Sequence, residues 1–213
     1  MIGDKLVITD YHRKAAAQVF SQLAPKLKEA QSPLAVSVAG ESGCGKSETA
    51  AVLAELCEKE GYKTIILQQD DYFVYPPATN HNTRLKDINW VGLQEVKLNI
   101  MEENIASVKE QKEATVKKPL VIFDEDKITD EEVSVSGVKV VIAEGTYTTT
   151  LKNVDLKCFI NRNYKQTKKA RLKRSRDPAT EFLEQVLAIE HDIISAHKKL
   201  AHVVIDPPED EKE

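Results

Sequence analysis

Short apolar runs alternate along the chain with longer stretches in which apolar residues recur every three or four positions. The runs have the length of β-strands and cover residues 34–39, 63–67, 119–123, 138–143, 156–160 and 202–205. Stretches between them, such as 93–113 and 181–200, have the spacing of amphipathic helices. Because parallel strands are joined by helical crossovers, the alternation predicts an α/β fold. We expect a mostly parallel sheet of five or six strands with helices on both faces.

A further helical pattern precedes the first strand, at residues 11–30, with Pro25 at a position that should kink or split the helix. We therefore divide the chain into a helical extension packed on the core (1–32), a core domain (33–206) and an acidic tail (207–213). A contact between copies of the chain in a homo-oligomer is the alternative use of this helix. Its apolar face is formed by Ala15, Val19, Leu23 and Leu27.

The composition is that of a globular protein, with 41% hydrophobic and 30% charged residues. The net charge of −4 argues against general nucleic-acid binding, although it allows a local basic patch. No apolar run approaches the roughly 18 residues of a membrane span, and the N-terminus lacks a signal-peptide core. Three cysteines without paired spacing suggest reduced thiols. Together these features predict a cytoplasmic protein without membrane association.

The sequence GESGCGKS at residues 40–47 matches the P-loop pattern G-x-x-x-x-G-K-[ST] between a predicted strand and a predicted helix. Glycines there let successive N–H groups point at phosphate oxygens, and the helix N-terminus adds positive charge. Lys46 should reach the outer phosphates, and Ser47 should ligate Mg²⁺. We expect Cys44 to be reachable from solvent. The predicted nucleotide-binding residues are Gly40, Glu41, Ser42, Gly43, Cys44, Gly45, Lys46, Ser47 and Glu48.

Acidic residues follow the predicted strands at Asp70-Asp71, at Asp124 with Asp126, and at Glu144. Ligands collect at the carboxyl ends of parallel strands, where one carboxylate can hold a metal and another can accept a hydroxyl proton. We predict Ser47, Asp70 and Glu144 as metal ligands. Glu144 could instead be an N-cap or a surface acid. Asp70, and more readily Asp71, could simply form a turn.

Residues 74–90 have no clear strand or helix pattern, and a long loop in a compact domain is usually functional or disordered. Its mixture of aromatic and polar residues favours a loop that faces a substrate over a linker. The candidate substrate-binding residues are Asp70, Tyr72, Arg84, Trp90, Asp124 and Tyr147.

A basic run at residues 168–176 places Lys168, Arg171 and Arg174 on one helix face. We predict a lid, at about residues 162–182, in which Arg171 and Arg174 act with Lys46 and Asp70 as catalytic residues by neutralising a moving phosphoryl group. A solvated helix face and an RNA-binding patch are the alternatives.

These motifs in this order resemble the uridine kinase and phosphoribulokinase family of P-loop kinases. The resemblance runs from about residue 34 to 205. It rests on GESGCGKS, on Gln69-Asp70 followed by aromatic residues, on Phe123-Asp124, on Glu144-Gly145 and on the basic stretch before Leu183-Glu184-Gln185. It implies a P-loop NTPase three-layer sandwich, ATP with Mg²⁺, Asp70 as catalytic base, and Ser47 with Glu144 around the metal. The loop near Asp206-Pro207 would border the adenine.

The chain departs from this family at two places. Residues 125–128 lack the aromatic residue and the histidine that uridine kinases place there, and Arg174-Ser175-Arg176 replaces an Arg-Gly-Arg lid signature. A smaller polyol or sugar, phosphorylated or otherwise anionic, would fit Arg84 and Lys127 as well as a nucleoside.

We therefore predict an ATP-dependent kinase for a small molecule with a hydroxyl acceptor: a nucleoside, a sugar or a polyol. A nucleotide-gated ATPase or switch protein is one alternative, although no guanine-reading motif is found. A kinase that acts on an RNA or protein hydroxyl through the basic lid is another. With a net negative charge, a nucleic-acid partner is the less favoured choice.

Overall fold

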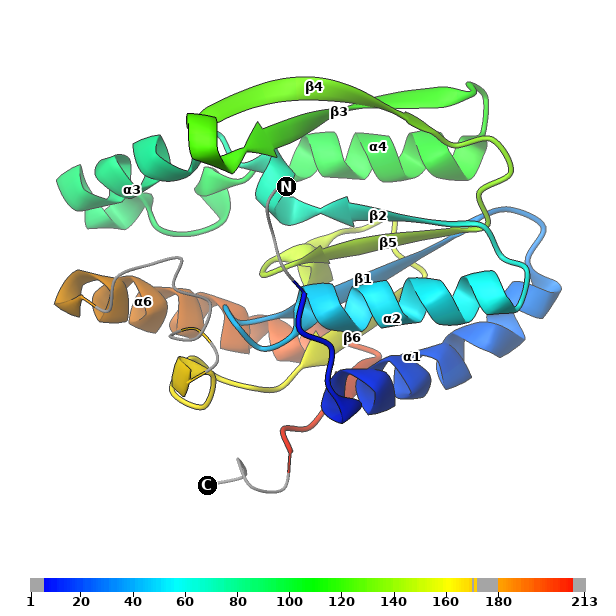
Figure 1. Ribbon diagram of the computed structural model, residues 1–213, viewed down its shortest axis with the longest axis horizontal. Coiled ribbons are helices and arrows are strands. Elements are labelled where there is room, and N and C mark those ends of the chain that lie inside the picture. Colours follow the sequence, from blue (N-terminus) through cyan, green and yellow to red (C-terminus); the bar gives the residue numbers. More distant parts are fainter. Residues whose placement is uncertain (1–5, 170, 172–179, 209–213) are drawn as a thin grey trace.

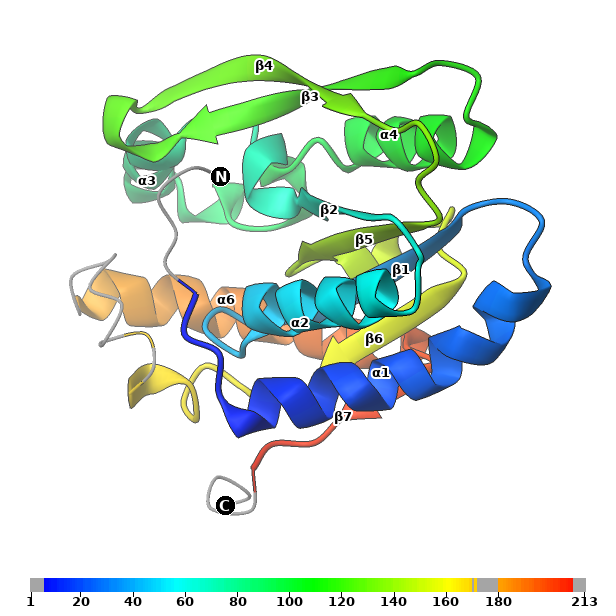
Figure 2. The ribbon, with the colours of Figure 1, turned by 45° about the vertical axis from the view of Figure 1, so that its right-hand side comes forward.

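The computed structural model describes residues 6–169, 171 and 180–208. Its centre is a parallel sheet with the strand order β2-β5-β1-β6-β7 (Figures 1 and 2). All pairs of neighbouring strands in this sheet are parallel, as the alternation of strands and helices predicted. The strands are β1 (Leu34–Gly40), β2 (Thr64–Gln68), β5 (Val140–Gly145), β6 (Leu156–Ile160) and β7 (Val203–Ile205).

Helices cover both faces of the sheet, which confirms the three-layer α/β sandwich. Alternate residues of the central strands point into two separate hydrophobic cores. Helices α1 (Asp10–Glu29) and α2 (Lys46–Lys59) enclose one core, and α4 (Leu98–Glu110) and α6 (Glu181–His197) enclose the other. Strand β5 is buried along its whole length because both of its faces are covered.

The strand predicted at residues 119–123 does not belong to this sheet. It is the end of β3 (Thr115–Ile122), which pairs antiparallel with β4 (Lys127–Ser134) in a hairpin of its own. The short helix η4 (Phe123–Glu125) and the positive φ of 46° at Asp126 reverse the chain between the two strands. Figure 1 shows the hairpin lying over α4, apart from the main sheet.

The long loop predicted at residues 74–90 is largely helical. Helix α3 (Pro77–Lys86) begins with a proline at its first position, where a fixed φ and a missing N–H are favourable. The Asp126 carboxylate of the hairpin turn accepts hydrogen bonds from the N–H groups of Ala78 (2.7 Å) and Thr79 (3.1 Å). This cap comes from 48 residues away along the chain, which explains why local pattern did not reveal the helix.

Helix α1 was predicted from its apolar spacing and forms as one continuous helix in spite of Pro25. Its apolar face is buried against α2 in the first core, and Figure 2 shows the two helices running along the same side of the sheet. Across the described ranges, no helix is both long and apolar enough to cross a membrane.

Candidate active site

The P-loop connects β1 to α2 and has the backbone geometry of a phosphate cradle. Gly43 and Gly45 have φ angles of 75° and 100°, in the left-handed region that favours glycine. A Cβ atom at Gly45 would lie 2.5 Å from Nε2 of His12, and one at Gly43 would lie 2.6 Å from Cγ of Arg171. These close approaches leave no room for side chains, so the backbone N–H groups can face a phosphate.

Lys46, Ser47 and two carboxylates gather at the mouth of this loop. Lys46 Nζ donates to the Glu41 carbonyl (2.9 Å), and Ser47 Oγ donates to Glu144 Oε1 (3.1 Å). Burial, together with the nearby Asp70 carboxylate, raises the pKa of Glu144 to about 7, whereas Lys46 opposes this shift. Asp70 itself is exposed, in the short helix η1 (Gln69–Tyr72) that follows β2.

The oxygen donors of Ser47, Asp70 and Glu144 fit Mg²⁺, which prefers oxygen ligands. In the described parts of the chain, no group of three or more His, Cys, Asp and Glu side chains could hold a metal by itself. Mg²⁺ usually keeps several waters and shares its shell with substrate phosphates, so a small protein contribution is what a P-loop site needs.

Gln69 fixes the relative positions of the two strand ends that carry Asp70 and Glu144. Its side chain is buried, donates to Thr146 Oγ1 (2.8 Å) and accepts from the Tyr147 N–H (2.8 Å). A Cβ at Gly145 would lie 2.2 Å from Gln69 Cβ, so this close packing requires a glycine. Sequence analysis identified Gln69 as part of a motif without assigning this role.

Asp71 and Tyr72 point away from the site, into the protein. Asp71 Oδ2 accepts from Lys118 Nζ (2.8 Å) and Oδ1 from the Val121 N–H (3.0 Å), which ties the hairpin to η1. Tyr72 is fully buried and donates to Asn104 Oδ1 (2.8 Å). The prediction of Tyr72 as a substrate-binding residue is therefore wrong, because successive residues of η1 point in different directions and its ring fills the core.

Arg84, predicted to bind substrate, lies in an ion-pair network. It pairs through Nε and Nη2 with the fully buried Glu95, and Nη2 also donates to Glu190 of α6 at 2.9 Å. Burial raises the pKa of Glu190, and the Arg84 charge opposes this shift. Neither Glu95 nor Glu190 was identified from the sequence, since they lie 11 and 106 residues from Arg84.

Trp90 and Tyr147 lie beside this network. Trp90 Nε1 donates to Asn80 Oδ1 (2.9 Å), Asn80 Nδ2 donates to Glu95 (3.1 Å), and the Trp90 ring contacts the half-exposed Tyr75 ring. Tyr147 is buried, and its hydroxyl has no hydrogen-bond partner among the described residues. Burial and the carboxylates of Glu190 and Glu95 raise the pKa of Tyr147.

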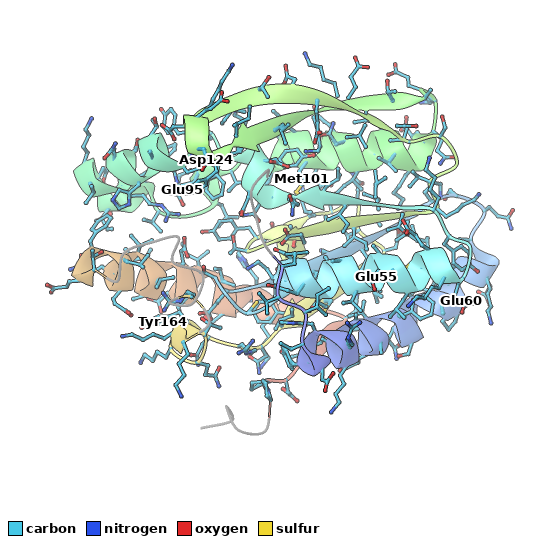
Figure 3. The ribbon with its side chains drawn as sticks, in the orientation of Figure 1. Glu55, Glu60, Glu95, Met101, Asp124 and Tyr164 are labelled. Atoms are coloured by element: carbon cyan, nitrogen blue, oxygen red, sulfur yellow. The ribbon has the colours of Figure 1, made fainter. Side chains whose placement is uncertain are left out.

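Asp124, the remaining substrate candidate, is exposed in η4 at the turn of the hairpin, and Figure 3 shows it there together with Glu95 on the strand-end side of the molecule. Asp124 had been predicted at the end of a strand of the main sheet. It does not lie there, because the hairpin is separate from that sheet.

Glu48, predicted to bind the nucleotide, is buried in the first turn of α2.

The start of the predicted lid contacts the P-loop directly. Thr167 Oγ1 donates to the Ser42 carbonyl (2.9 Å), and Arg171 Nη2 donates to the Tyr164 carbonyl (2.9 Å) while its aliphatic part lies against Gly43. Nε of Arg171 is buried and has no partner within the described ranges. Arg174, the second predicted lid residue, lies outside them.

A cavity of about 450 Å³ adjoins the P-loop on the side of α6. The Glu41 side chain forms part of its wall, accepting from the Tyr164 N–H (2.6 Å) and pairing with His191 Nδ1 (2.7 Å). His191 was not identified from the sequence because it lies 150 residues from Glu41. The other residues around the cavity include Asn161, Arg162, Asn163, Lys198, Asp206 and Pro207.

Cys44 is fully buried, so the prediction that solvent reaches it is wrong. Its thiol is directed toward Gly40 and the end of β6, and it belongs to the first hydrophobic core. Burial raises the pKa of the Cys44 thiol. Any contact of Cys44 with a nucleotide would be through its backbone.

A P-loop follows the central strand β1 of a parallel sheet, with acidic residues at or just after the ends of β5 and β2 and a cation of the predicted lid against the loop. This arrangement defines the class of P-loop kinases. Comparison with known proteins agrees with this class. Residues 35–205 match the Phosphoribulokinase / Uridine kinase family, and the chain belongs to that family. The family resemblance inferred from the sequence is thereby confirmed.

Two relatives illustrate the range of the family. The chain is 26% identical over 190 residues to a bifunctional alpha-galactosidase/sucrose kinase of Mediterraneibacter gnavus, a match that covers 83% of this chain and 20% of that protein. It is 29% identical over 136 residues to a uridine kinase of Ureaplasma urealyticum, covering 62% of this chain and 63% of the relative. The matches thus span less than two thirds of either relative.

Solved structures with low sequence identity share the fold. Phosphoribulokinase from Rhodobacter spheroides superposes with a TM-score of 0.64 at 13% identity, covering 86% of this chain and 74% of that one. D-glycerate 3-kinase from Cryptococcus neoformans superposes with a TM-score of 0.57 at 16% identity, covering 87% of each chain.

Proposed function

We propose that this protein is an ATP-dependent kinase that transfers the γ-phosphoryl group to a hydroxyl of a small molecule. The observation that carries the proposal is the meeting of the P-loop, through Lys46 and Ser47, with two carboxylates: Glu144 of β5 and Asp70, which directly follows the neighbouring β2. Phosphoryl transfer needs positioning and charge stabilisation more than covalent chemistry, and this arrangement offers both.

In this proposal each residue of the site has a separate role. Lys46 exchanges its hydrogen bond with the Glu41 carbonyl for one with an outer phosphate oxygen. Asp70, the exposed carboxylate, accepts the proton of the acceptor hydroxyl. Ser47 and Glu144 would hold Mg²⁺, which when bound offsets the negative charge of the phosphates. Arg171 adds a cation on the lid side of the loop.

The cavity beside Glu41 is our choice for the nucleotide base. It opens at the P-loop and is bordered by Asp206 and Pro207, where the family resemblance places the adenine. The paired side chains of Glu41 and His191 form part of its wall. Use of ATP as phosphoryl donor also supports the expectation of a cytoplasmic protein.

The acceptor is proposed at the level of its chemistry. The named relatives include kinases of sucrose, uridine and D-glycerate, whose shared feature is an alcohol group. For this chain we accordingly propose a sugar, a polyol or a nucleoside.

The test is acceptor-dependent release of ADP, measured over a panel of such compounds. Asp70→Asn should lower turnover at least ~100-fold, because proton transfer of this kind contributes 10²–10⁴-fold, while ATP binding is retained. Lys46→Ala should lower both turnover and ATP affinity. Hydrolysis of ATP that no acceptor stimulates would favour an ATPase or switch protein instead, and full activity of Asp70→Asn would refute the assigned base.

A further inference from the structure

We infer that the acceptor is an uncharged sugar or polyol, and that Arg84 serves this site by holding two carboxylates rather than by binding an anionic group. The inference rests on the proposed kinase function and deepens it. A lone arginine beside an acceptor site would select a phosphorylated or carboxylated substrate. The surroundings of Arg84 reverse that expectation.

The charge of Arg84 is already offset within the protein. Glu95 has a fully buried side chain and accepts from Arg84 twice, and Glu190 accepts from it at 2.9 Å. Glu95 is further held by Asn80 (3.1 Å) and by the Gly92 N–H (3.1 Å), so it is a fixed part of the site. One guanidinium thus serves two carboxyl groups of the protein, which leaves none of its charge for an anionic group of a substrate.

This network extends to the proposed reaction centre. His191, the residue after Glu190 in α6, pairs with Glu41 of the P-loop at 2.7 Å. On the acceptor side, Lys46 is committed to phosphate in the proposed function. Among the described residues, Lys46 and Arg84 are thus both occupied, and a second anion would meet Asp70 and Glu190, which is unfavourable in a poorly solvated site.

Hydroxyl groups, in contrast, suit this environment. The Tyr147 hydroxyl is buried, lies near Arg84 and both carboxylates, and has no hydrogen-bond partner among the described residues. An unsatisfied buried hydroxyl is unfavourable, and a substrate hydroxyl could satisfy it while donating to Glu190. The adjacent aromatic pair of Tyr75 and Trp90 offers an apolar surface for the C–H groups of a sugar.

The deciding experiment compares matched acceptors that differ only in a phosphate: glycerol with glycerol 3-phosphate, ribose with ribose 5-phosphate, and fructose with fructose 6-phosphate, together with glycerate and uridine. We expect at least one free sugar or polyol to stimulate ADP release, with kcat/KM about 100-fold above that of its phosphorylated form. Preference for a phosphorylated or carboxylated acceptor, or for uridine alone, would overturn the inference and leave the kinase function intact.

Binding without turnover separates the two proposals. Trp90 is the single tryptophan of the chain and lies next to the network, so its fluorescence should report acceptor binding in the absence of nucleotide. An uncharged acceptor that binds but never stimulates ADP release would support the inference and refute the kinase function. No response of Trp90 and no turnover with any uncharged sugar or polyol would refute the inference. The kinase function would be refuted as well only if the charged compounds and uridine also failed to stimulate ADP release.

The variant Glu190→Gln tests the charge directly. It should weaken binding of the uncharged acceptor about 10-fold. It should also lower, by a similar factor, the ratio of kcat/KM for the free compound to kcat/KM for its phosphorylated form. Asp192→Asn, an exposed position on the same helix, is the matched control and should change neither value. A merely structural role of Glu190 would leave the discrimination against phosphate unchanged. If Glu190→Gln does not fold, the wild-type panel still decides.

Discussion

The neighbouring aspartates of η1 should respond to the same substitution in opposite ways. Asp71 has a side chain that is 2% exposed and is paired with Lys118, whose side chain is 5% exposed. In Asp71→Asn one of the two acceptor oxygens becomes a donor, which must face either Lys118 Nζ or the Val121 N–H. The variant therefore leaves a buried donor without an acceptor, and it deprives a buried cation of the more deeply buried of its two carboxylate partners.

The expected loss of stability follows from these contacts. Removing one member of a buried ion pair typically costs about 3–5 kcal/mol in the free energy of unfolding. Lys118 keeps Glu131 and the Pro119 carbonyl as partners, so we expect the lower end, about 3 kcal/mol. For a chain of this size, about 2–4 °C per kcal/mol gives a fall in melting temperature of roughly 6–12 °C.

Thermal unfolding followed by circular dichroism measures this shift. Asp130→Asn breaks the exposed Lys117–Asp130 pair on the same hairpin and should not change the melting temperature measurably. Asp70→Asn, one residue away, should keep the melting temperature within about 2 °C while losing turnover. Equal stability of Asp71→Asn and the wild type would show that the hairpin is not held by this pair, and the reasoning would fail.

Three other outcomes can be measured with little effort. The three cysteines are buried, and burial raises the pKa of Cys57 to about 11. At pH 8 a thiol reagent should therefore modify none of them in the native protein and all three after unfolding, and one fast-reacting thiol in the native protein would contradict the burial. Tyr72→Phe should lose about 1 kcal/mol of stability with an unchanged kcat, since its hydroxyl bonds to Asn104 in the core; a lower kcat would return Tyr72 to the site. Asp126→Ala removes the cap of α3 and should destabilise the protein by about 1 kcal/mol. It should raise the KM for the acceptor but not the KM for ATP; an equal rise in both KM values would show that α3 does not serve the acceptor alone.

The main sheet and the P-loop could be predicted because their signals are local. Apolar runs, helical spacing and the glycines of residues 40–47 lie within single elements. The pairing of a strand is not local: nothing within residues 115–122 distinguishes an antiparallel partner from a place in the parallel sheet. Helix α3 was missed for the same reason, since its cap is provided by the distant Asp126.

The site itself shows the same division. Lys46, Ser47 and Glu144 were found because motif and strand end coincide, and the structure brings them together. Arg84 was found as a charge, but its meaning depends on Glu190, which lies 106 residues further along the chain. Charge alone indicates what a side chain could bind, whereas its partners in the fold decide what it is free to bind.

The β3–β4 hairpin is independent of the sheet that carries the P-loop. In the described part of the chain, its strands pair only with each other, and side chains such as Asp71 and Asp126 attach the hairpin to the rest of the domain. Insertions or replacements in this ribbon can therefore accumulate without shifting the register of the five central strands. Since Asp126 of the hairpin turn caps α3, such changes would reach the start of α3 and leave the P-loop in place.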